Sequence, residues 1–462
     1  MLYIISMTFK RNDKIPVFSL LTALLPAFLA LSCVSSPDVY KDIDLAVRQD
    51  DFEQAIAAIV AGQELRRPIY SEKNAIMLFL DKGLLEHYAR NYANSSRDLQ
   101  QAERLIEEAY TKSITASFAS YIANDNAKDY PGEDFEDIYL NVFNALNYYN
   151  RGDIEGALVE IRKLSMSSGK LDMLGRKYDY RDPNTGASLN ETVQRETGVS
   201  ELPQENPVNF SNSALARYLA ALFYLASGND DGARIEFDQL QSAFETNRYI
   251  YRHPVPTAVQ EVQNVPEGKA RLNIISFTGL SPIKVEENVQ LYFPFFQHPI
   301  LHIANFKLPK LVERPSIISR IEVVTGDYRF DLELLENMGA VIEETFAIHY
   351  SNILLKTYIR TILKYVAADI AAMETVKQSG ELAGALVALA AKTALEATES
   401  ADIRMSRYLP NRAHVGGVNL DPGTYDVTIN FYSGRAIIAH AERSNFTVRE
   451  GDINLIDVVC LK

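Results

Sequence analysis

Two stretches of the chain, ALNYYNRGDIEGALVEIRKL at 145–164 and ALFYLASGNDDGARIEFDQL at 221–240, align with each other without a gap. The residues that match in type include Ala145 with Ala221, Tyr148 with Tyr224, Gly152 with Gly228, Asp153 with Asn229, Ala157 with Ala233, and Leu164 with Leu240. Each stretch holds an apolar run with helical spacing, then a glycine, then Asp or Asn, then a second run. Glycine ends a helix because it adopts positive φ without strain, and Asp or Asn begins the next helix as its cap. We therefore predict a helix–turn–helix unit in each copy, with the alanines where helices cross and the tyrosines in the groove beside them.

Two fainter copies precede this pair. The segment 44–60 places Asp50 and Asp51 at the turn position, and the segment 81–110 has Gly83 and Ala102 in a unit for which we expect a lengthened turn. A single unit cannot bury its apolar face alone, so neighbouring units must stack. The pattern predicts eight to ten helices between about 39 and 250. The polar, turn-rich segment 170–210 is expected to be a long excursion between the last two units.

The spacing of these copies resembles the tetratricopeptide repeat (TPR), a helix–turn–helix of about 34 residues. The resemblance implies a stack of helix pairs whose concave surface binds a peptide or another protein. The alternative is a compact helical domain in which no groove is used.

Beyond about 265 the pattern changes to strands and turns. Alternating apolar and polar residues between turn signals predict strands at 270–280, at 318–324 and over most of 418–461. Helical spacing is found at 330–346, 350–376 and 382–400. The last of these is very apolar, but its uncharged core is too short to span a bilayer.

These patterns together predict an α+β multidomain protein. A TPR-like α-helical array at 33–250 is followed by a smaller mixed domain at 265–462. In the second domain we expect antiparallel strands to form a small sheet or sandwich, on which two long helices pack.

The N-terminal segment has the layout of a secretory signal peptide. Lys10, Arg11 and Lys14 precede an apolar run that ends in Ala30-Leu31-Ser32-Cys33. This ending resembles the lipobox of bacterial lipoproteins, which implies a signal peptide at 1–32 and acyl chains on Cys33. Two or more acyl chains are needed for stable anchoring, and a triacylated cysteine supplies them. The alternatives are a cleaved, unanchored protein and an uncleaved anchor; Met7 is a second candidate for the start.

The membrane that carries the protein is expected to be the bacterial outer membrane. Val34 stands where an aspartate would resemble an inner-membrane retention signal, and the chain would face the periplasm or the cell surface. The net charge is −14, so nucleic acid is an unfavourable partner, because phosphate binding needs a basic face. The second cysteine of the chain, Cys460, lies in an apolar strand pattern and is expected to be a small buried hydrophobe.

The search for reactive motifs predicts no catalytic residues, no metal site and no cofactor. His298 and His302 are four residues apart, but Pro299 argues against the helix that such a chelate needs. Ser281 with Lys284, and Ser167 with Lys170, match SxxK. The other motifs of serine acyl-enzymes are missing, so we interpret both matches as chance.

Three arginines, Arg404, Arg407 and Arg412, cluster in the sequence ADIRMSRYLPNRAHVGG at 401–417. Loops often carry function, so this segment is a possible binding loop. The alternative is that the arginines anchor the loop to local carboxylates and carbonyls.

The chain as a whole resembles a broad family of bacterial lipoproteins with no established activity. The resemblance is carried by the lipobox, the TPR-like helices, TGLSPIK at 278–284, IRTILKYVAA at 359–368 and the 401–427 segment. It implies a lipid-anchored, non-enzymatic scaffold that binds other envelope proteins through its helices, and it points to work in envelope assembly. The alternative is an envelope hydrolase or ligand-binding lipoprotein with its site in the C-terminal domain.

Overall fold

The computed structural model describes residues 39–114, 126, 128–165, 170, 191, 210, 212–295, 298–347, 350, 353, 354, 356, 357, 360 and 400–462. Contacts divide the chain into Met1–Asp42 and Ile43–Lys462, and the second unit is the subject below. Several predicted features lie outside the described residues. They are the signal peptide, Cys33, most of the excursion at 170–210, and most of the helices at 350–376 and 382–400. Of the helices that are described, none is long and apolar enough to cross a membrane.

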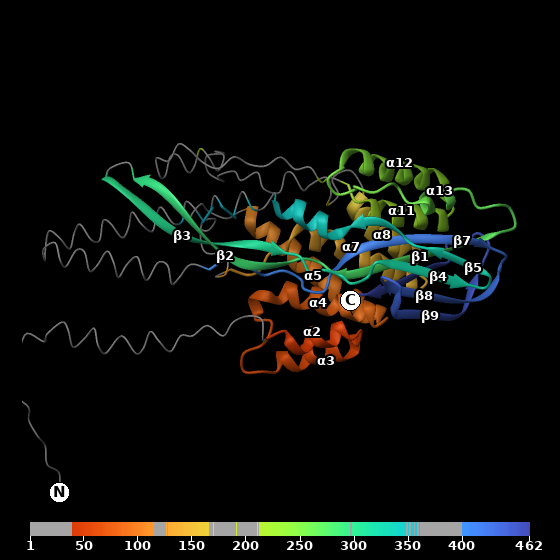
Figure 1. Ribbon diagram of the computed structural model, residues 1–462, viewed down its shortest axis with the longest axis horizontal. Helices are drawn as coiled ribbons and strands as arrows, with labels where there is room; N and C mark the ends of the chain where they lie inside the picture. The colour runs from red at the N-terminus through yellow and green to blue at the C-terminus, as the bar shows by residue number, and fades with distance from the viewer. Residues whose placement is uncertain are drawn as a thin grey trace, which may run out of the picture. The chain divides into compact units, whose positions relative to one another are not determined.

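Eight of the described α-helices form four helical hairpins (Figure 1). The hairpins are α2 (Lys41–Arg48) with α3 (Phe52–Gln63), α4 (Ala75–Tyr88) with α5 (Tyr92–Ile114), α7 (Asp134–Asn150) with α8 (Ile154–Ser165), and α11 (Ala214–Ala226) with α12 (Asp230–Thr246). Successive hairpins touch through α3 and α4, α5 and α7, and α8 and α11. We call α2, α4, α7 and α11 the inner helices, and α3, α5, α8 and α12 the outer helices. Two short helices, η2 (Glu72–Asn74) and α13 (Thr257–Glu261), complete this part.

All four hairpins use the same turn. The residue at positive φ is Asp50 (58°), Arg90 (64°), Gly152 (78°) or Gly228 (71°). The next residue donates its N–H to a carbonyl five residues back; the pairs are Asp51 to Ala46 (3.0 Å), Asn91 to Glu86 (2.8 Å), Asp153 to Tyr148 (2.9 Å) and Asn229 to Tyr224 (2.9 Å). The predicted helix-ending role of the two glycines is confirmed.

The prediction of a lengthened turn in 81–110 is wrong. The turn there is at 89–91 and is as short as the others, while Gly83 lies inside α4. A Cβ at Gly83 would come within 2.8 Å of the Leu99 side chain, so this glycine permits close packing of α4 on α5 and does not make a turn.

The strands form two four-stranded sheets and one hairpin. The first sheet has the order β10 (Leu455–Cys460), β1 (Ala270–Leu280), β7 (Pro410–Leu420), β6 (Glu333–Asn337). The second has the order β5 (Tyr328–Asp331), β4 (Arg320–Thr325), β8 (Gly423–Ser433), β9 (Ala436–Val448). The α+β class is therefore confirmed, and so are the strands predicted at 270–280 and in 418–461.

Two predictions about the strands fail. β10 pairs with β1 in parallel, since the chain leaves β9 in one sheet and returns beside β1 in the other. The segment 330–346 is helical only from 338; its first half forms β5 and β6. Short apolar runs are ambiguous between helix and strand, and here pairing of β6 with β7 decides for strand.

The core of the strand part lies between the two sheets. Buried residues of β1, β4, β8 and β10 form one apolar cluster, which includes Ile274, Val323, Ile429 and Val458. Cys460 belongs to this cluster, and burial raises the pKa of its thiol to about 12, which fits the predicted buried hydrophobe.

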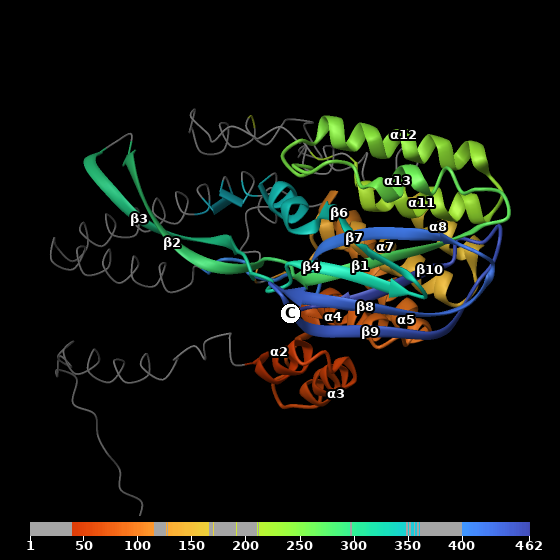
Figure 2. The same cartoon turned by 45° about the vertical axis from the view of Figure 1, so that its right-hand side comes forward.

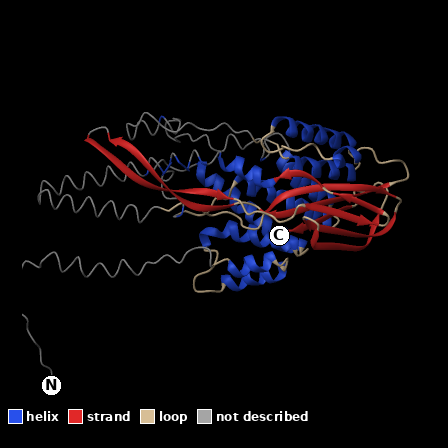
Figure 3. Ribbon diagram, viewed as in Figure 1, coloured by secondary structure: helices blue, strands red, loops and turns tan. Residues whose placement is uncertain are grey.

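β1 joins the sandwich to the helices. It is buried on both faces, as expected of a strand covered on two sides. On the helix side, the rings of Phe277 on β1 and Phe143 on α7 lie 4.9 Å apart. Figures 2 and 3 show the strands running across the helices. Helices give way to strands between α13 and β1, and the division into domains at 33–250 and 265–462 stays a prediction.

The hairpin of β2 (Ile283–Phe295) and β3 (His298–Val312) was not expected from the sequence. Its outer end lies away from both sheets in Figure 1. His298 and His302 belong to the strand β3, and not to the helix that a chelate with this spacing needs.

Candidate functional site

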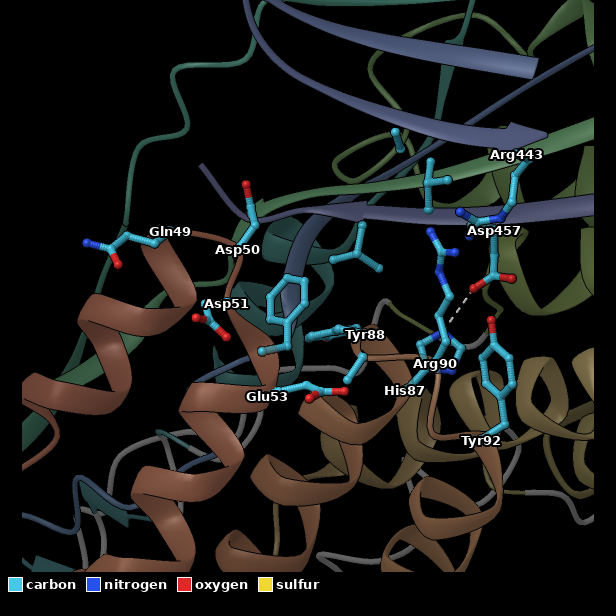
Figure 4. Close-up of a pocket in the computed structure, with 15 residues that line it drawn as sticks. Gln49, Asp50, Asp51, Glu53, His87, Tyr88, Arg90, Tyr92, Arg443 and Asp457 are labelled. Carbon is cyan, nitrogen blue, oxygen red and sulfur yellow. Dashed lines mark hydrogen bonds and ion pairs between the residues drawn. The ribbon is translucent and has the colours of Figure 1, made fainter. Parts of the chain in front are cut away.

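A pocket of about 430 Å³ lies where the first two helical hairpins meet the edge of the strands (Figure 4). The turns between α2 and α3 and between α4 and α5 form one wall, and β9 and β10 form the other. Its polar lining residues are Gln49, Asp50, Asp51, Glu53, His87, Tyr88, Arg90, Tyr92, Arg443 and Asp457.

A buried hydrogen-bonded chain starts at the floor of this pocket. The Ser95 hydroxyl donates to the Gly83 carbonyl (2.7 Å), and Asn147 Nδ2 donates to Ser95 Oγ (2.8 Å). Asn147 Oδ1 therefore faces His87 Nδ1 at 2.7 Å and accepts a hydrogen bond from the Nδ1–H group. His87 Nε2 lies 3.2 Å from Asp457 Oδ2, so this contact places α4 beside β10.

Neighbouring groups stabilise the negative charge of the Asp457 carboxylate. Burial alone would raise the pKa of this carboxyl group, but the hydrogen bonds from His87 and Asn150 and the charge of Arg443 outweigh it, and the pKa is lowered. Asn150 Nδ2 donates to Asp457 Oδ1 at 2.8 Å. The pKa of the nearby Tyr92 is raised by burial and by the charge of Asp457, so its hydroxyl stays protonated and available as a donor.

Two guanidinium groups occupy the same end of the pocket. Figure 4 shows the Arg90 and Arg443 side chains running toward each other from the α4–α5 turn and from β9. Burial and the charge of Arg90 lower the pKa of Arg443. Arg443 donates to the backbone carbonyl oxygens of Glu442 (3.1 Å) and Asp457 (3.2 Å), and these two hydrogen bonds fix its position.

The opposite end of the pocket is acidic. Asp50, Asp51 and Glu53 lie there, and Tyr88 stands between them and the arginines in Figure 4. The Tyr88 ring packs edge-on against Phe52, with centroids 5.4 Å apart. The pocket therefore has a cationic end, an aromatic middle and an anionic end.

The residues singled out from the repeat build the array and do not line this pocket. Ala145, Ala157, Ala221 and Ala233 are buried. Tyr148 and Tyr224 are half-buried over the second helix of their own hairpin, where Gly156 and Gly232 leave room. A Cβ at Gly156 would lie 2.5 Å from Tyr148 Cδ1, and one at Gly232 would lie 3.0 Å from Tyr224 Cδ1. These two glycines are part of the repeat and were missed.

The arginine-rich segment is engaged inside the chain. Arg404 pairs with Asp402 (2.8 Å) and lies over the Tyr130 ring at 5.3 Å. Arg407 pairs with Asp44 on α2 at 2.8 Å. Arg412 lies apart from both, exposed on β7. The contacts of the first two arginines are of the kind that the anchoring alternative describes, and a binding role stays a prediction.

Buried carboxylates of the inner helices hold this same segment. Asp81 accepts hydrogen bonds from the Ser406 hydroxyl (2.7 Å) and the Arg407 N–H (2.8 Å). Glu136 accepts from the Ser406 N–H, and the Tyr88 hydroxyl donates to the Tyr408 carbonyl at 2.8 Å. Residues 400–409 therefore cover part of the inner face of the array.

The SxxK pair at 281–284 has no catalytic geometry. The ammonium of Lys284 forms a buried ion pair with Glu133, and the buried Ser281 Oγ has no hydrogen-bond partner. Within the described ranges, no group of three or more His, Cys, Asp or Glu residues could hold a metal ion.

The sequence patterns pointed to none of the polar residues of the pocket except Asp50 and Asp51 at the first turn. One signal was present: Arg90 occupies the turn position that Gly152 and Gly228 hold in the other hairpins. Comparison of the chain with protein-family models, with curated proteins and with solved structures finds no match.

Proposed function

We propose that this chain is a lipid-anchored bacterial envelope protein that acts as a non-enzymatic, protein-binding scaffold through a TPR-like array. The observation that carries the proposal is the series of four helical hairpins with one shared turn. Arrays of this kind present extended surfaces to other proteins.

The geometry favours the outer helices as the partner-binding surface. The inner face is covered by the chain's own strands and by residues 400–409, through contacts such as Phe143 with Phe277 and Asp81 with Ser406. On the outer helices, Val159 and Ile235 are 52% and 50% exposed. They occupy the same position in the two aligned copies, so the apolar exposure repeats with the array.

The location follows from the proposed acylation of Cys33. These acyl chains would anchor the protein in the outer membrane, where the chain faces the periplasm or the cell surface. The charge of −14 supports neither nucleic acid nor an anionic lipid surface as the main partner.

The alternative function is an envelope hydrolase or a ligand-binding lipoprotein. No observation favours the hydrolase. The pocket favours ligand binding, at a site that the first two hairpins share with β9 and β10.

Site-specific photo-crosslinking in cells tests the scaffold. A photoreactive residue at position 159 or 235 should yield the same discrete crosslinked protein, since both positions face outward on the array. A matched control is position 437 on β9, which is 53% exposed but lies outside the array. If positions 159 and 235 give only the products seen at 437, or none, the outer helices are not the binding surface.

A further inference from the structure

The turn positions of the first two hairpins carry charged side chains where glycine would be easier. Asp50 and Arg90 adopt φ of 58° and 64°, a region in which non-glycine residues are strained. The equivalent positions in the other hairpins are Gly152 and Gly228. Only the first two turns line the pocket, so the strained turns are those whose side chains reach it.

The cationic end of the pocket holds two guanidinium groups, and the Asp457 carboxylate acts as a counterion near one of them, Arg443. Within the described residues, no hydrogen bond or ion pair engages the Arg90 guanidinium. The Asp457 carboxylate also lies 3.2 Å from His87 Nε2 and accepts a hydrogen bond from Asn150 Nδ2. Two guanidinium groups that face each other repel, and an oxyanion placed between them would remove the repulsion and accept their N–H groups.

The carboxylates at the anionic end of the pocket would attract a positively charged group of the same ligand. Asp50 pairs with Lys462 at 2.8 Å through Oδ2, but its Oδ1 is buried and has no hydrogen-bond partner among the residues that the structure describes. Glu53 and Asp51 add two exposed carboxylates. The volume of about 430 Å³ is within the range of small-molecule sites, and the Tyr88 ring offers an apolar wall between the two ends.

We propose that this pocket binds a zwitterionic phosphate ligand, with the phosphate between Arg90 and Arg443 and a short cationic arm directed toward Asp50 and Glu53. The Tyr92 hydroxyl is a further donor near the phosphate. Both a free phosphoethanolamine and the headgroup of phosphatidylethanolamine have this chemistry. The inference goes beyond the scaffold and deepens the ligand-binding alternative.

Calorimetric titration of the purified full chain tests the proposal with three probes: phosphoethanolamine, inorganic phosphate and ethanolamine. We expect saturable binding in that order of decreasing affinity, because only the first probe satisfies both ends. Flotation with vesicles of phosphatidylethanolamine, compared with phosphatidylglycerol, separates a lipid headgroup from a free metabolite. These measurements need no partner protein, so their failure would leave the scaffold proposal standing.

The decisive variant is Arg90→Gly, which gives this turn the residue found in two other hairpins. Its thermal midpoint should be unchanged or higher, while its affinity for phosphoethanolamine should fall about tenfold, as expected for a lost charge-assisted hydrogen bond. Arg90→Lys should keep part of the affinity, and Arg449→Gln, an exposed arginine outside the pocket, should match the unmodified chain. Absence of saturable binding at millimolar phosphoethanolamine, or equal affinity in Arg90→Gly, would overturn the proposal.

Discussion

Glu336 is the residue whose removal should weaken the attachment of the strands to the helices most. It lies on β6, is 0% exposed, and accepts four hydrogen bonds from the helical part. The donors are Tyr139 Oη (2.8 Å), Ser213 Oγ (2.9 Å), the Leu215 N–H (3.1 Å) and Tyr251 Oη (2.7 Å). The change Glu336→Ala leaves these donors buried without an acceptor.

The expected loss of stability follows from the donors left behind. An unsatisfied buried donor costs about 1–3 kcal/mol, but the hydroxyls can rotate and water can enter the space of the missing side chain. The four costs therefore do not add in full, and we expect a total of about 3–5 kcal/mol, less than four separate losses at the middle of that range would give. Glu336→Gln keeps the shape but turns one acceptor into a donor, so its cost should be smaller.

Urea denaturation of the full chain measures this loss. The chain has 25 tyrosines and no tryptophan, so tyrosine fluorescence reports on packing and far-ultraviolet circular dichroism on the helices. Both midpoints should fall together in Glu336→Ala. The control is Glu450→Ala, an exposed position at which about 0.5 kcal/mol or less is expected. A loss for Glu336→Ala no larger than for the control would refute the reasoning, and so would a helical signal that stays unchanged while the tyrosine signal shifts.

Four further predictions concern single positions. Burial and the charge of Glu133 raise the pKa of Glu136 from 4.5 to about 8, so between these pH values the folded chain keeps a proton that the unfolded chain releases. The free energy of unfolding should therefore fall by about 5 kcal/mol as the pH rises from 4.5 to 8. Urea titrations across this pH range measure the fall, and Glu136→Gln should flatten it. Gly152→Ala should cost about 1–2 kcal/mol from positive φ alone, with the helices intact by circular dichroism, because nothing lies within 4 Å of the added carbon. Gly156→Ala has ordinary φ but meets the Tyr148 ring, and should cost about 1–3 kcal/mol; equal melting of both variants with the unmodified chain would contradict the packing described. Cys33→Ser should abolish labelled-palmitate uptake and release the chain from the membrane fraction, whereas unchanged labelling would contradict the lipobox interpretation.

The helical hairpins were predictable because their signals are local. A helix needs apolar residues three and four positions apart, and its end needs a residue suited to positive φ, as at Gly152 and Gly228. The prediction failed at 81–110 because Arg90, a residue with no local preference for that conformation, makes the turn. The alternation of β1 and of the last strands is local in the same way.

The candidate site was not predictable from local signals. Its cationic end joins Arg90 to Arg443, and its buried chain joins His87 to Asp457, residues separated by hundreds of positions. Each of these side chains alone is an ordinary surface or core residue. They form a site only because β9 and β10 pack against the turns of the first two helical hairpins. No spacing in the sequence specifies this packing.

The sequence by itself determined the change from helices to strands after about 265, the shared turn of the two best repeats and the acidic balance of the chain. Only the tertiary structure decided that β6 is a strand, that β10 runs parallel to β1, and that residues 400–409 cover the inner face of the array. The physical reason is that helix periodicity and turn conformation depend on neighbours within a few residues. Strand partners, buried carboxylate contacts and pockets depend on which distant segments exclude water together.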